Sequence, residues 1–524
     1  MHIFATLDRV VTSRIGGGLS RAAMHLACAS VLAFAPMTQG ATAPTTLPPL
    51  VVGDEPIIVT QHRIQTANGP LDYEARVGRL PIRNDENGEL RGRLFFTAYI
   101  VKTKGPRRPL TFVWNGGPTQ PSNLLHLELM GPRRRVADHL VDNPETLLAQ
   151  TDLVFYDPVE TGFSRPEKPE FAAEFLNMKG DVAATVEFIR AYRIRFRAAD
   201  QPLFVAGESY GVFRAAYVTD VLTQQGVKLV GSILISGDIP NIPQPLAFYN
   251  AMHIQARTVV AYYFHKLSPE LMRDRTATLK EANDWATNVY MPALQKLDTL
   301  GDTDREKIAQ DLARYIGMRA DQVDRRTLVV TNRHFNEDLF DGDKTKQLVK
   351  TDSRVLTTDN RDRGLPTVTD SYFRDELGYA TDLTYLPSES GYLGTPGPGG
   401  RRRSTYDQWT YNQDGITPEI MARTRDEGEV TYIAMNNPTW IPNALKRDKR
   451  LEVFVATGRF DSMNMCEGNV LATATLPVDL SSRISNHCYE GGHQMYRDEP
   501  ARLLMSRELS EFIRGAALAR SEGS

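Results

Sequence analysis

Residues 202–224 read PLFVAGESYGVFRAAYVTDVLTQ, and this stretch decides the fold that the sequence predicts. The apolar run 202–206 predicts a buried strand, and residues 212–224 have the spacing of a helix. Between them stands Gly207-Glu208-Ser209-Tyr210-Gly211, the single Gly-x-Ser-x-Gly of the chain. A serine on a sharp turn from strand to helix is typical of a nucleophile, and glycines beside it let the backbone make that turn. We therefore predict that Ser209 is a catalytic nucleophile.

Two backbone N–H groups are candidates to bind the oxyanion that such a nucleophile creates. The N–H of Tyr210 begins the predicted helix and points toward developing negative charge. An earlier strand-like run, 110–114, ends in the turn Asn115-Gly116-Gly117-Pro118. In α/β-hydrolases the second donor comes from the loop after that strand, which makes Gly117 the candidate. A purely structural glycine turn is the alternative for this segment.

A serine nucleophile needs a base, and the base needs an acid that orients it. In this fold the acid and then the histidine follow the serine along the chain. A strand-like run ends at Asp461, and of the ten histidines only His487 and His493 come after it. Because His493 follows Gly491-Gly492, a flexible turn, we favour it as the base over His487.

Apolar strands that alternate with helices predict an α/β-hydrolase fold, with a mostly parallel central sheet flanked by helices. Residues 246–325 look helical and amphipathic, and Pro292 is expected to kink or split a helix at 285–297. We therefore expect a signal peptide at 1–43, a first core part at 44–240, a helical cap at 241–430 and a second core part at 431–524. The expected strands are 57–61, 94–101, 110–114, 152–157, 202–206, 230–236 and 451–456, and further helices are expected at 180–197, 212–224, 251–264 and 499–514.

The composition excludes several classes of protein. The chain has 524 residues, of which 41% are apolar and 24% charged, which is the profile of a globular protein. Lys plus Arg total 61 against 64 acids, so there is no basic balance that would favour nucleic acid. Beyond the first forty-odd residues no apolar run reaches the ~18 residues of a membrane helix. Nothing in the sequence specifies an oligomeric state.

The N-terminus resembles an export signal. Three arginines precede the apolar stretch 22–35, and Ala41-Thr42-Ala43 is a pattern that a signal peptidase accepts. A wrongly chosen start or an N-terminal helix is the alternative, and Cys28 is poorly placed for lipid attachment. We therefore expect a periplasmic or secreted protein, in which Cys466 and Cys488 are a candidate disulfide. Two unpaired thiols are the alternative.

These residues together resemble the serine carboxypeptidase family, over nearly all of the chain after residue 43. The family's Trp-Asn-Gly-Gly-Pro pattern is matched by 114–118 and its Gly-Glu-Ser-Tyr by 207–210, while its Asp-x-Pro-x-x-x-Gly-Phe-Ser is similar to 157–164, with Pro one place early. Its Gly-Asp-x-Asp aspartate corresponds to Asp461, and its Gly-Gly-His-Met histidine to His493, with Gln494 where Met is usual. A family Glu that precedes Gly-Pro corresponds to Glu128.

The resemblance implies how a substrate is selected. In the family, the residues at Asn115 and Glu208 bind the terminal carboxylate of a peptide, and a second Glu, here Glu128, hydrogen-bonds the first. Two facing carboxyls cannot both ionise cheaply, so one keeps its proton and can donate to the substrate. The resemblance therefore implies carboxypeptidase activity that is best under acidic conditions, with peptide or protein C-termini as substrates.

The sequence departs from the family pattern near the oxyanion turn. Gln120 stands where the family has a cysteine, so the disulfide that anchors this loop is missing, and Pro121 changes the start of the next helix. A bond between Cys466 and Cys488 would instead join the loops of Asp461 and His493. The run Arg133-Arg134-Arg135 favours acidic substrates or is simply a solvated face.

The sequence as a whole predicts an exported serine carboxypeptidase with the triad Ser209, Asp461 and His493, and with no metal and no organic cofactor. An esterase or acyltransferase that uses the same triad is the nearest alternative. A non-catalytic binding protein that kept the fold is another, and a partner-binding role of the arginine-rich loop 394–404 is a third.

Overall fold

The computed structural model describes residues 45–47, 49–51, 53–105, 107–237, 244–356, 366–386, 408–410 and 439–521. The described residues belong to one compact unit. The predicted signal peptide and the arginine-rich loop 394–404 lie outside the described residues. The predicted boundary near 240 falls in an undescribed gap, as does the boundary near 430, so the three-part division stays a prediction.

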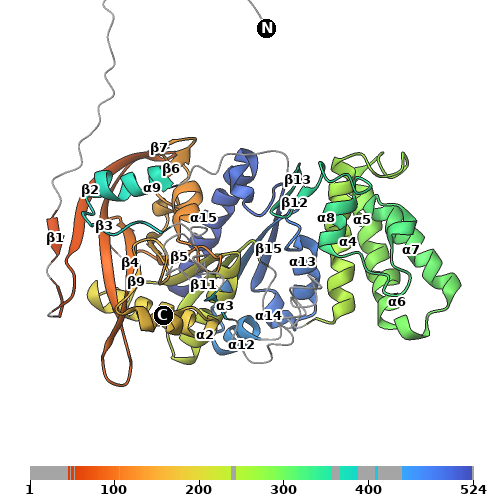
Figure 1. Cartoon of the computed structure of the whole chain (residues 1–524). Coiled ribbons are helices and arrows are strands. Elements are labelled where there is room, and N and C mark those ends of the chain that lie inside the picture. Colours follow the sequence, from red (N-terminus) through yellow and green to blue (C-terminus); the bar gives the residue numbers. More distant parts are fainter. Residues whose placement is uncertain are drawn as a thin grey trace, which may run out of the picture. The chain divides into compact units, whose positions relative to one another are not determined.

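An 11-stranded sheet forms the centre of the described part of the chain (Figure 1). Its strands lie in the order β1 (Thr45–Leu47), β2 (Ile57–Thr66), β3 (Gly69–Arg83), β4 (Leu90–Ile100), β8 (Asp152–Tyr156), β5 (Leu110–Trp114), β10 (Leu203–Glu208), β11 (Leu229–Ile235), β14 (Glu452–Gly458) and β15 (Ile484–Tyr489), and β9 (Arg165–Pro166) pairs with β4.

The sheet has a parallel and an antiparallel part. Strands β8, β5, β10, β11, β14 and β15 run parallel to one another, while β1 to β4 pair antiparallel, as β4 does with β8. The predicted α/β-hydrolase fold with a parallel central sheet is confirmed. The antiparallel strands were recognised only in part, because β3 was not predicted. Its signal is Asn68-Gly69 at the tight turn between β2 and β3, a sequence that favours hairpins.

Helices cover both faces of the parallel strands, as Figure 1 shows for α2, α3 and α12 on one side and α15 on the other. The helices are α1 (Ala172–Phe175), α2 (Met178–Arg195), α3 (Tyr210–Gln224), α4 (Leu246–Tyr263), α5 (Arg275–Trp285), α6 (Met291–Gln295), α7 (Asp302–Ile316), α8 (Asn332–Asp338), α9 (Pro366–Ser371), α12 (Trp440–Arg447), α13 (Cys466–Ala474), α14 (Val478–Ser481) and α15 (Glu499–Ser521). None of these helices is long and apolar enough to span a membrane.

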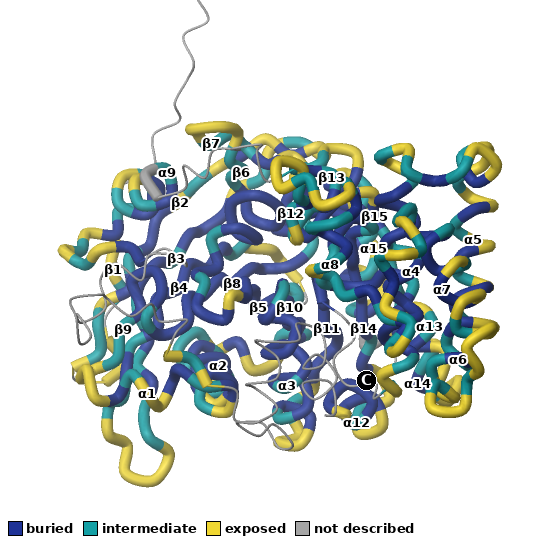
Figure 2. Tube along the Cα trace, turned by 45° about the vertical axis from the view of Figure 1, so that its right-hand side comes forward, coloured by how far each residue is buried: buried dark blue, intermediate teal, exposed yellow. Residues whose placement is uncertain are grey.

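The core lies in two apolar layers, one on each face of the sheet. Within β10, Leu203 and Val205 face the layer of α2 and α3, while Phe204 and Ala206 face the layer of α15. All of β10 is buried, as are the strands beside it (Figure 2). A strand buried on both faces is continuously apolar, which is why these runs were recognisable in the sequence.

The described part of the insertion after β11 is mostly helical, with α4 to α9 and one short hairpin. The predicted helix 285–297 is split, because α5 ends at Trp285, a π-helical segment η4 (Ala286–Tyr290) follows, and α6 begins at Met291. Pro292 stands in the first turn of α6, where the N–H that it lacks would have no partner within the helix. Side chains of α4 belong to the same apolar layer as α2 and α3.

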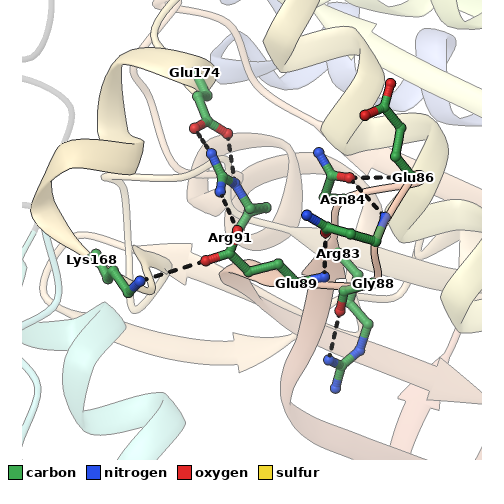
Figure 3. A network of polar contacts seen from close by, with 9 residues as sticks. Arg83, Asn84, Glu86, Gly88, Glu89, Arg91, Lys168 and Glu174 are labelled. Atoms are coloured by element: carbon green, nitrogen blue, oxygen red, sulfur yellow. Dashed lines mark hydrogen bonds and ion pairs between the residues drawn. The ribbon is translucent and has the colours of Figure 1, made fainter.

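A network of polar contacts holds the turn between β3 and β4, on the far side of the sheet from β15 (Figure 3). Asn84 Oδ1 accepts hydrogen bonds from the N–H groups of Glu86 at 2.9 Å and Asn87 at 3.2 Å. Arg91 donates to Glu89 and Glu174, which ties this hairpin to helix α1. These exposed contacts join the β3–β4 hairpin to α1.

Candidate active site

Ser209 lies on the turn that joins β10 to α3. Its backbone has φ 58° and ψ −127°, a strained conformation that L-residues rarely adopt. A side chain at Gly207 would collide with the carbonyl of Gly211, and one at Gly211 would lie 2.9 Å from the carbonyl oxygen of Asn115. The two glycines are therefore required by close packing of backbone, which is the physical reason for the Gly-x-Ser-x-Gly pattern.

Asp461 and His493 follow β14 and β15, at the same edge of the sheet where β10 ends at Glu208. His493 Nδ1 lies 2.7 Å from Asp461 Oδ2, and both side chains are buried. Met463 N and Asn464 Nδ2 also donate to the carboxylate of Asp461, at 3.0 Å and 2.6 Å. The aspartate is thus held in a position to orient the imidazole.

Charge and burial act in opposite directions on His493. Burial lowers the pKa of His493, but the Asp461 carboxylate and its hydrogen bond raise it by more, so the pKa lies above its ordinary value. The rival candidate, His487, lies within β15 and pairs with Glu508 Oε2 at 3.1 Å. The structure therefore brings His493, and not His487, to Asp461.

A short hairpin of the insertion contacts both loops, and sequence reasoning missed it. It consists of β12 (Leu348–Val349) and β13 (Asp352–Leu356). The carbonyl of Thr351 accepts from His493 N at 2.6 Å, and Ser353 N donates to the carbonyl of Phe460 at 2.9 Å. The insertion thereby fixes the backbone beside the acid and the base.

The loop after β5 packs directly against the nucleophile. A side chain at Gly116 would lie 2.6 Å from Tyr210 N and 2.9 Å from Ser209 Cβ. The carbonyl of Gly116 accepts from Gln120 N at 3.1 Å, which orients the peptide whose N–H belongs to Gly117. The predicted oxyanion donors, Gly117 and Tyr210, thus lie on two segments that touch each other at Ser209.

A buried arginine, Arg214, joins this loop to the helix of the nucleophile. Its side chain is fully buried in α3, and Nε donates to Asp181 Oδ2 at 2.7 Å. Nη1 donates to the carbonyl of Asn115 at 2.9 Å, and Nη2 to that of Pro118 at 3.4 Å. Arg214 was not predicted. The signal was available, since it is the only charged residue of 209–219.

The Glu208 carboxyl is buried beside Ser209 and is bound by two side chains. Oε2 accepts from Asn115 Nδ2, and Oε1 accepts from the hydroxyl of Tyr496 at 2.8 Å. Burial raises the pKa of Glu208 to about 7, against the opposing effects of His493, Tyr496 and Arg497. Glu208 therefore keeps its proton in mildly acidic solution.

Glu128 does not pair with Glu208 as the sequence analysis expected. It lies in the π-helical segment η1 (Leu125–Met130), and its carboxylate accepts from Arg135 and from Arg497 Nε, the latter at 2.7 Å. Among the described residues no hydrogen bond joins the two carboxyl groups. The expectation was wrong because Glu128 forms ion pairs with two arginines instead. The local sequence around Glu128 does not predict these pairs.

The run Arg133-Arg134-Arg135 does not form a simple solvated face. Arg133 pairs with Asp142 and, at 3.2 Å, with Glu376, while Arg135 pairs with Glu128. Two of the three arginines are thus paired with carboxylates of the protein.

Cys466 and Cys488 form a disulfide, with their Cα atoms 5.7 Å apart. Cys466 begins α13, which follows the loop of Asp461, and Cys488 lies in β15, which precedes His493. The bond therefore joins the segments that carry the acid and the base.

A family model described as serine carboxypeptidase matches residues 69–287. Over these residues the chain is similar to the serine carboxypeptidase family. It is also 28% identical, over 166 residues, to the pheromone-processing carboxypeptidase KEX1 of Verticillium alfalfae. That match covers 31% of this chain and 25% of the relative, so the chain spans about a quarter of the relative's length. The catalytic serine expected of the serine carboxypeptidase family falls within the matched residues, while Asp461 and His493 lie beyond them.

Solved structures also align with the chain. A lipase in its open form is 14% identical in sequence and has a TM-score of 0.37. The alignment covers 84% of this chain and 99% of the lipase chain. Proline iminopeptidase of Mycobacterium smegmatis is 12% identical in sequence and has a TM-score of 0.33. The alignment covers 84% of this chain and 100% of the iminopeptidase chain. A carboxyl esterase of Bacillus coagulans is 12% identical in sequence and has a TM-score of 0.35. The alignment covers 84% of this chain and 99% of the esterase chain.

Proposed function

We propose that this chain is an exported serine carboxypeptidase, which releases the C-terminal residue of peptides through an acyl-enzyme on Ser209. The observation that carries the proposal is the hydrogen bond between Asn115 and the buried carboxyl of Glu208, immediately before the nucleophile. In the family these two positions bind the substrate's free carboxylate. The match of residues 69–287 to the serine carboxypeptidase model supports the same substrate class.

The reaction proceeds in two halves. Ser209 Oγ attacks the scissile carbonyl carbon while His493 takes the hydroxyl proton, and Asp461 stabilises the imidazolium. The N–H groups of Gly117 and Tyr210 stabilise the oxyanion. The C–N bond then breaks, His493 gives its proton to the leaving amine, and the acyl-enzyme remains. Water, deprotonated by His493, attacks the ester, and Ser209 regains its proton as the shortened peptide leaves.

The activity is proposed to prefer acidic pH when the substrate carries a free carboxylate. Below about pH 7 the carboxyl of Glu208 is protonated, because burial raises its pKa to about 7, and it can then donate to the substrate. Above that pH an ionised Glu208 repels the substrate's carboxylate. Protonation of His493, whose pKa is raised by Asp461, removes the general base as the pH falls, so the rate also declines on the acidic side of the pH profile.

The test compares an N-blocked dipeptide with its C-terminal amide from about pH 4 to 8, with Ser209→Ala as the control. Release of the last residue from the free acid, strongest at low pH and absent in the variant, is expected. A burst of the first product would reveal the acyl-enzyme. Hydrolysis of simple esters with neither peptide cleaved would instead assign an esterase or acyltransferase. Failure of a phosphonate probe to label Ser209 would contradict any catalytic role.

Export to the periplasm or the medium is proposed on the residues of 1–43. The disulfide Cys466–Cys488 supports it, because such bonds persist in oxidising compartments. N-terminal sequencing of the protein from fractionated cells tests the proposal. A mature end after Ala43 in the exported fraction is expected, and an uncleaved chain in the cytoplasm would contradict it.

A further inference from the structure

Glu128 binds two arginines, which creates a cationic group close enough to act on the carboxyl of Glu208. The Glu128 side chain is 7% exposed, and its carboxylate contacts Arg135 and Arg497. Two guanidinium groups and one carboxylate leave a net charge of +1 at this point. The neighbouring carboxyl of Glu208 adds no charge while it is protonated. The group is therefore suited to an anion.

Arg497 is the more accessible of the two cations. Its side chain is 46% exposed, against 17% for that of Arg135. Nε donates to Glu128 Oε2 at 2.7 Å and Nη2 to Oε1 at 3.2 Å, which holds the guanidinium in one orientation. A planar guanidinium is matched to a carboxylate, because its N–H groups can form two parallel hydrogen bonds.

One short turn places Arg497 next to the carboxyl of Glu208. This turn, η9 (Met495–Arg497), directly follows Gln494 and comes just after His493. Tyr496 donates its hydroxyl to Glu208 Oε1 at 2.8 Å, while Arg497 reaches Glu128 in η1. The positive charge of Arg497 also acts on Glu208, since it lowers the pKa that burial raises. The turn thus links the base, the buried carboxyl and an accessible cation.

We propose that Arg497 binds the free carboxylate of the substrate's C-terminal residue, and that Glu128 holds its guanidinium in place. This inference rests on the proposed carboxypeptidase function and adds a specificity-determining residue to it. In the pair of facing carboxyls that the resemblance implied, binding of the substrate's carboxylate depends on a proton kept by one carboxyl. Here a permanent cation, Arg497, also contributes to that binding.

The pH dependence of binding follows from the groups that face Arg497. These are Glu128 and Arg135 from the segment after β5, Glu208 at the end of β10, and Gln494 and Tyr496 from its own turn. A guanidinium does not titrate below about pH 12. Ionisation of Glu208 lowers the attraction for an anion, but Arg497 keeps part of it. KM for a free-acid peptide should therefore rise only moderately above pH 7.

The test measures kcat/KM on an N-blocked dipeptide and on the ethyl ester of the same N-blocked amino acid, which has the same acyl group and no terminal carboxylate. Arg497→Gln should lower kcat/KM on the dipeptide about 10- to 100-fold, the usual loss for a charged hydrogen bond, mostly through KM. In the same variant, kcat/KM on the ester should change less than about threefold. Arg497→Lys should recover part of the loss, since it keeps the charge.

Two further variants separate binding from structure. Arg135→Gln removes the other cation on Glu128, and it should lower dipeptide turnover less than Arg497→Gln does. Arg333→Gln, an exposed arginine of α8 paired with Glu337, should change nothing. The proposal would be overturned if Arg497→Gln lowered kcat/KM equally on the dipeptide and on the ester. It would also be overturned if Arg135→Gln lowered kcat/KM on the dipeptide as much as Arg497→Gln does.

The same measurements separate this inference from the proposed function. A wild-type protein that cleaves the dipeptide, with an Arg497→Gln variant that cleaves it equally well from pH 5 to 8, overturns the role of Arg497 alone. A wild-type protein that hydrolyses the ester but not the dipeptide overturns both, because no substrate carboxylate is then recognised.

Discussion

Arg214 Nη1 donates a hydrogen bond to the carbonyl oxygen of Asn115 at 2.9 Å, across 99 residues of sequence. The contact joins the helix that begins after Ser209 to the loop that carries Gly117. Asp181 neutralises the guanidinium at 2.7 Å, so a buried cation is retained without an unpaired charge. Where the family has a disulfide on this loop, the present chain has a buried hydrogen-bonded ion pair.

Arg214→Met should lower both stability and turnover. Removing one partner of a buried ion pair costs about 3–5 kcal/mol of unfolding free energy, because Asp181 is left uncompensated. The loop should also lose its position relative to the nucleophile, which should lower kcat about 10- to 1,000-fold while KM changes little. Denaturant unfolding and steady-state kinetics measure the two effects.

A second variant separates these effects for Arg214. Asp181→Leu combined with Arg214→Met removes both charges and should regain most of the lost stability. Its kcat should stay low, because the hydrogen bonds to Asn115 and Pro118 remain absent. Full recovery of kcat in the double variant would show that Arg214 matters for folding alone.

Gly116→Ala should impair catalysis by displacing the oxyanion loop. Its Cβ would lie 2.6 Å from both Glu208 O and Tyr210 N, which are backbone atoms that cannot move independently. We expect kcat on an ester substrate to fall at least about 100-fold, the effect of losing one oxyanion donor. Gly301→Ala is the matched control, because no atom lies within 4 Å of its added Cβ. Unchanged kcat in Gly116→Ala would contradict the assigned position of the loop.

Asp461→Asn should leave the fold intact and nearly abolish turnover. The amide has the shape of the carboxylate but cannot stabilise the imidazolium of His493 at 2.7 Å. In a triad of this geometry the expected loss in kcat is about 10,000-fold. Ester hydrolysis followed over a wide enzyme concentration range measures it. His487→Asn is the control, and a comparable loss there would reverse the choice between the two histidines.

Glu208→Gln should remove the fall of free-acid cleavage above pH 7. The wild-type carboxyl loses its proton at about pH 7, whereas the amide stays neutral at every pH, so KM should become nearly independent of pH between 6 and 8.

The pH dependence of the free energy of unfolding provides a second test of the raised pKa of Glu208. Because the folded pKa is raised, the wild type loses stability as pH rises from about 4.5 to 7. The stability difference, Gln variant minus wild type, should therefore be larger at pH 8 than at pH 5, and a pH-independent difference would contradict the raised pKa.

Replacing Cys466 and Cys488 by serine should lower the free energy of unfolding by about 3 kcal/mol, the usual value for a loop of about 20 residues. Reductant should destabilise the wild type to a similar extent and leave the double variant unchanged. We also expect reduced kcat, because the bond joins the segments of Asp461 and His493. Equal sensitivity of both proteins to reductant would argue against the bond.

Much of the fold was predictable because its signals are local. Buried strands such as 202–206 and 152–157 are continuously apolar, and the glycines beside Ser209 follow from backbone contacts within a few residues. The order of Ser209, Asp461 and His493 along the chain follows from strand–turn–helix logic. The antiparallel strand β3 was missed because its alternation is imperfect, although Asn68-Gly69 marks its start.

By itself the sequence predicted the proposed nucleophile, its two partners and the strands that precede Ser209 and Asp461, while β15, which precedes His493, was not predicted. The tertiary structure decided which charges meet. Glu128 pairs with Arg497, 369 residues away, and not with Glu208, and Arg214 holds the loop at Asn115. The physical reason is that the strength of a charged contact depends on distance in space and on burial. Neither quantity is encoded in the local pattern of residues around a charge.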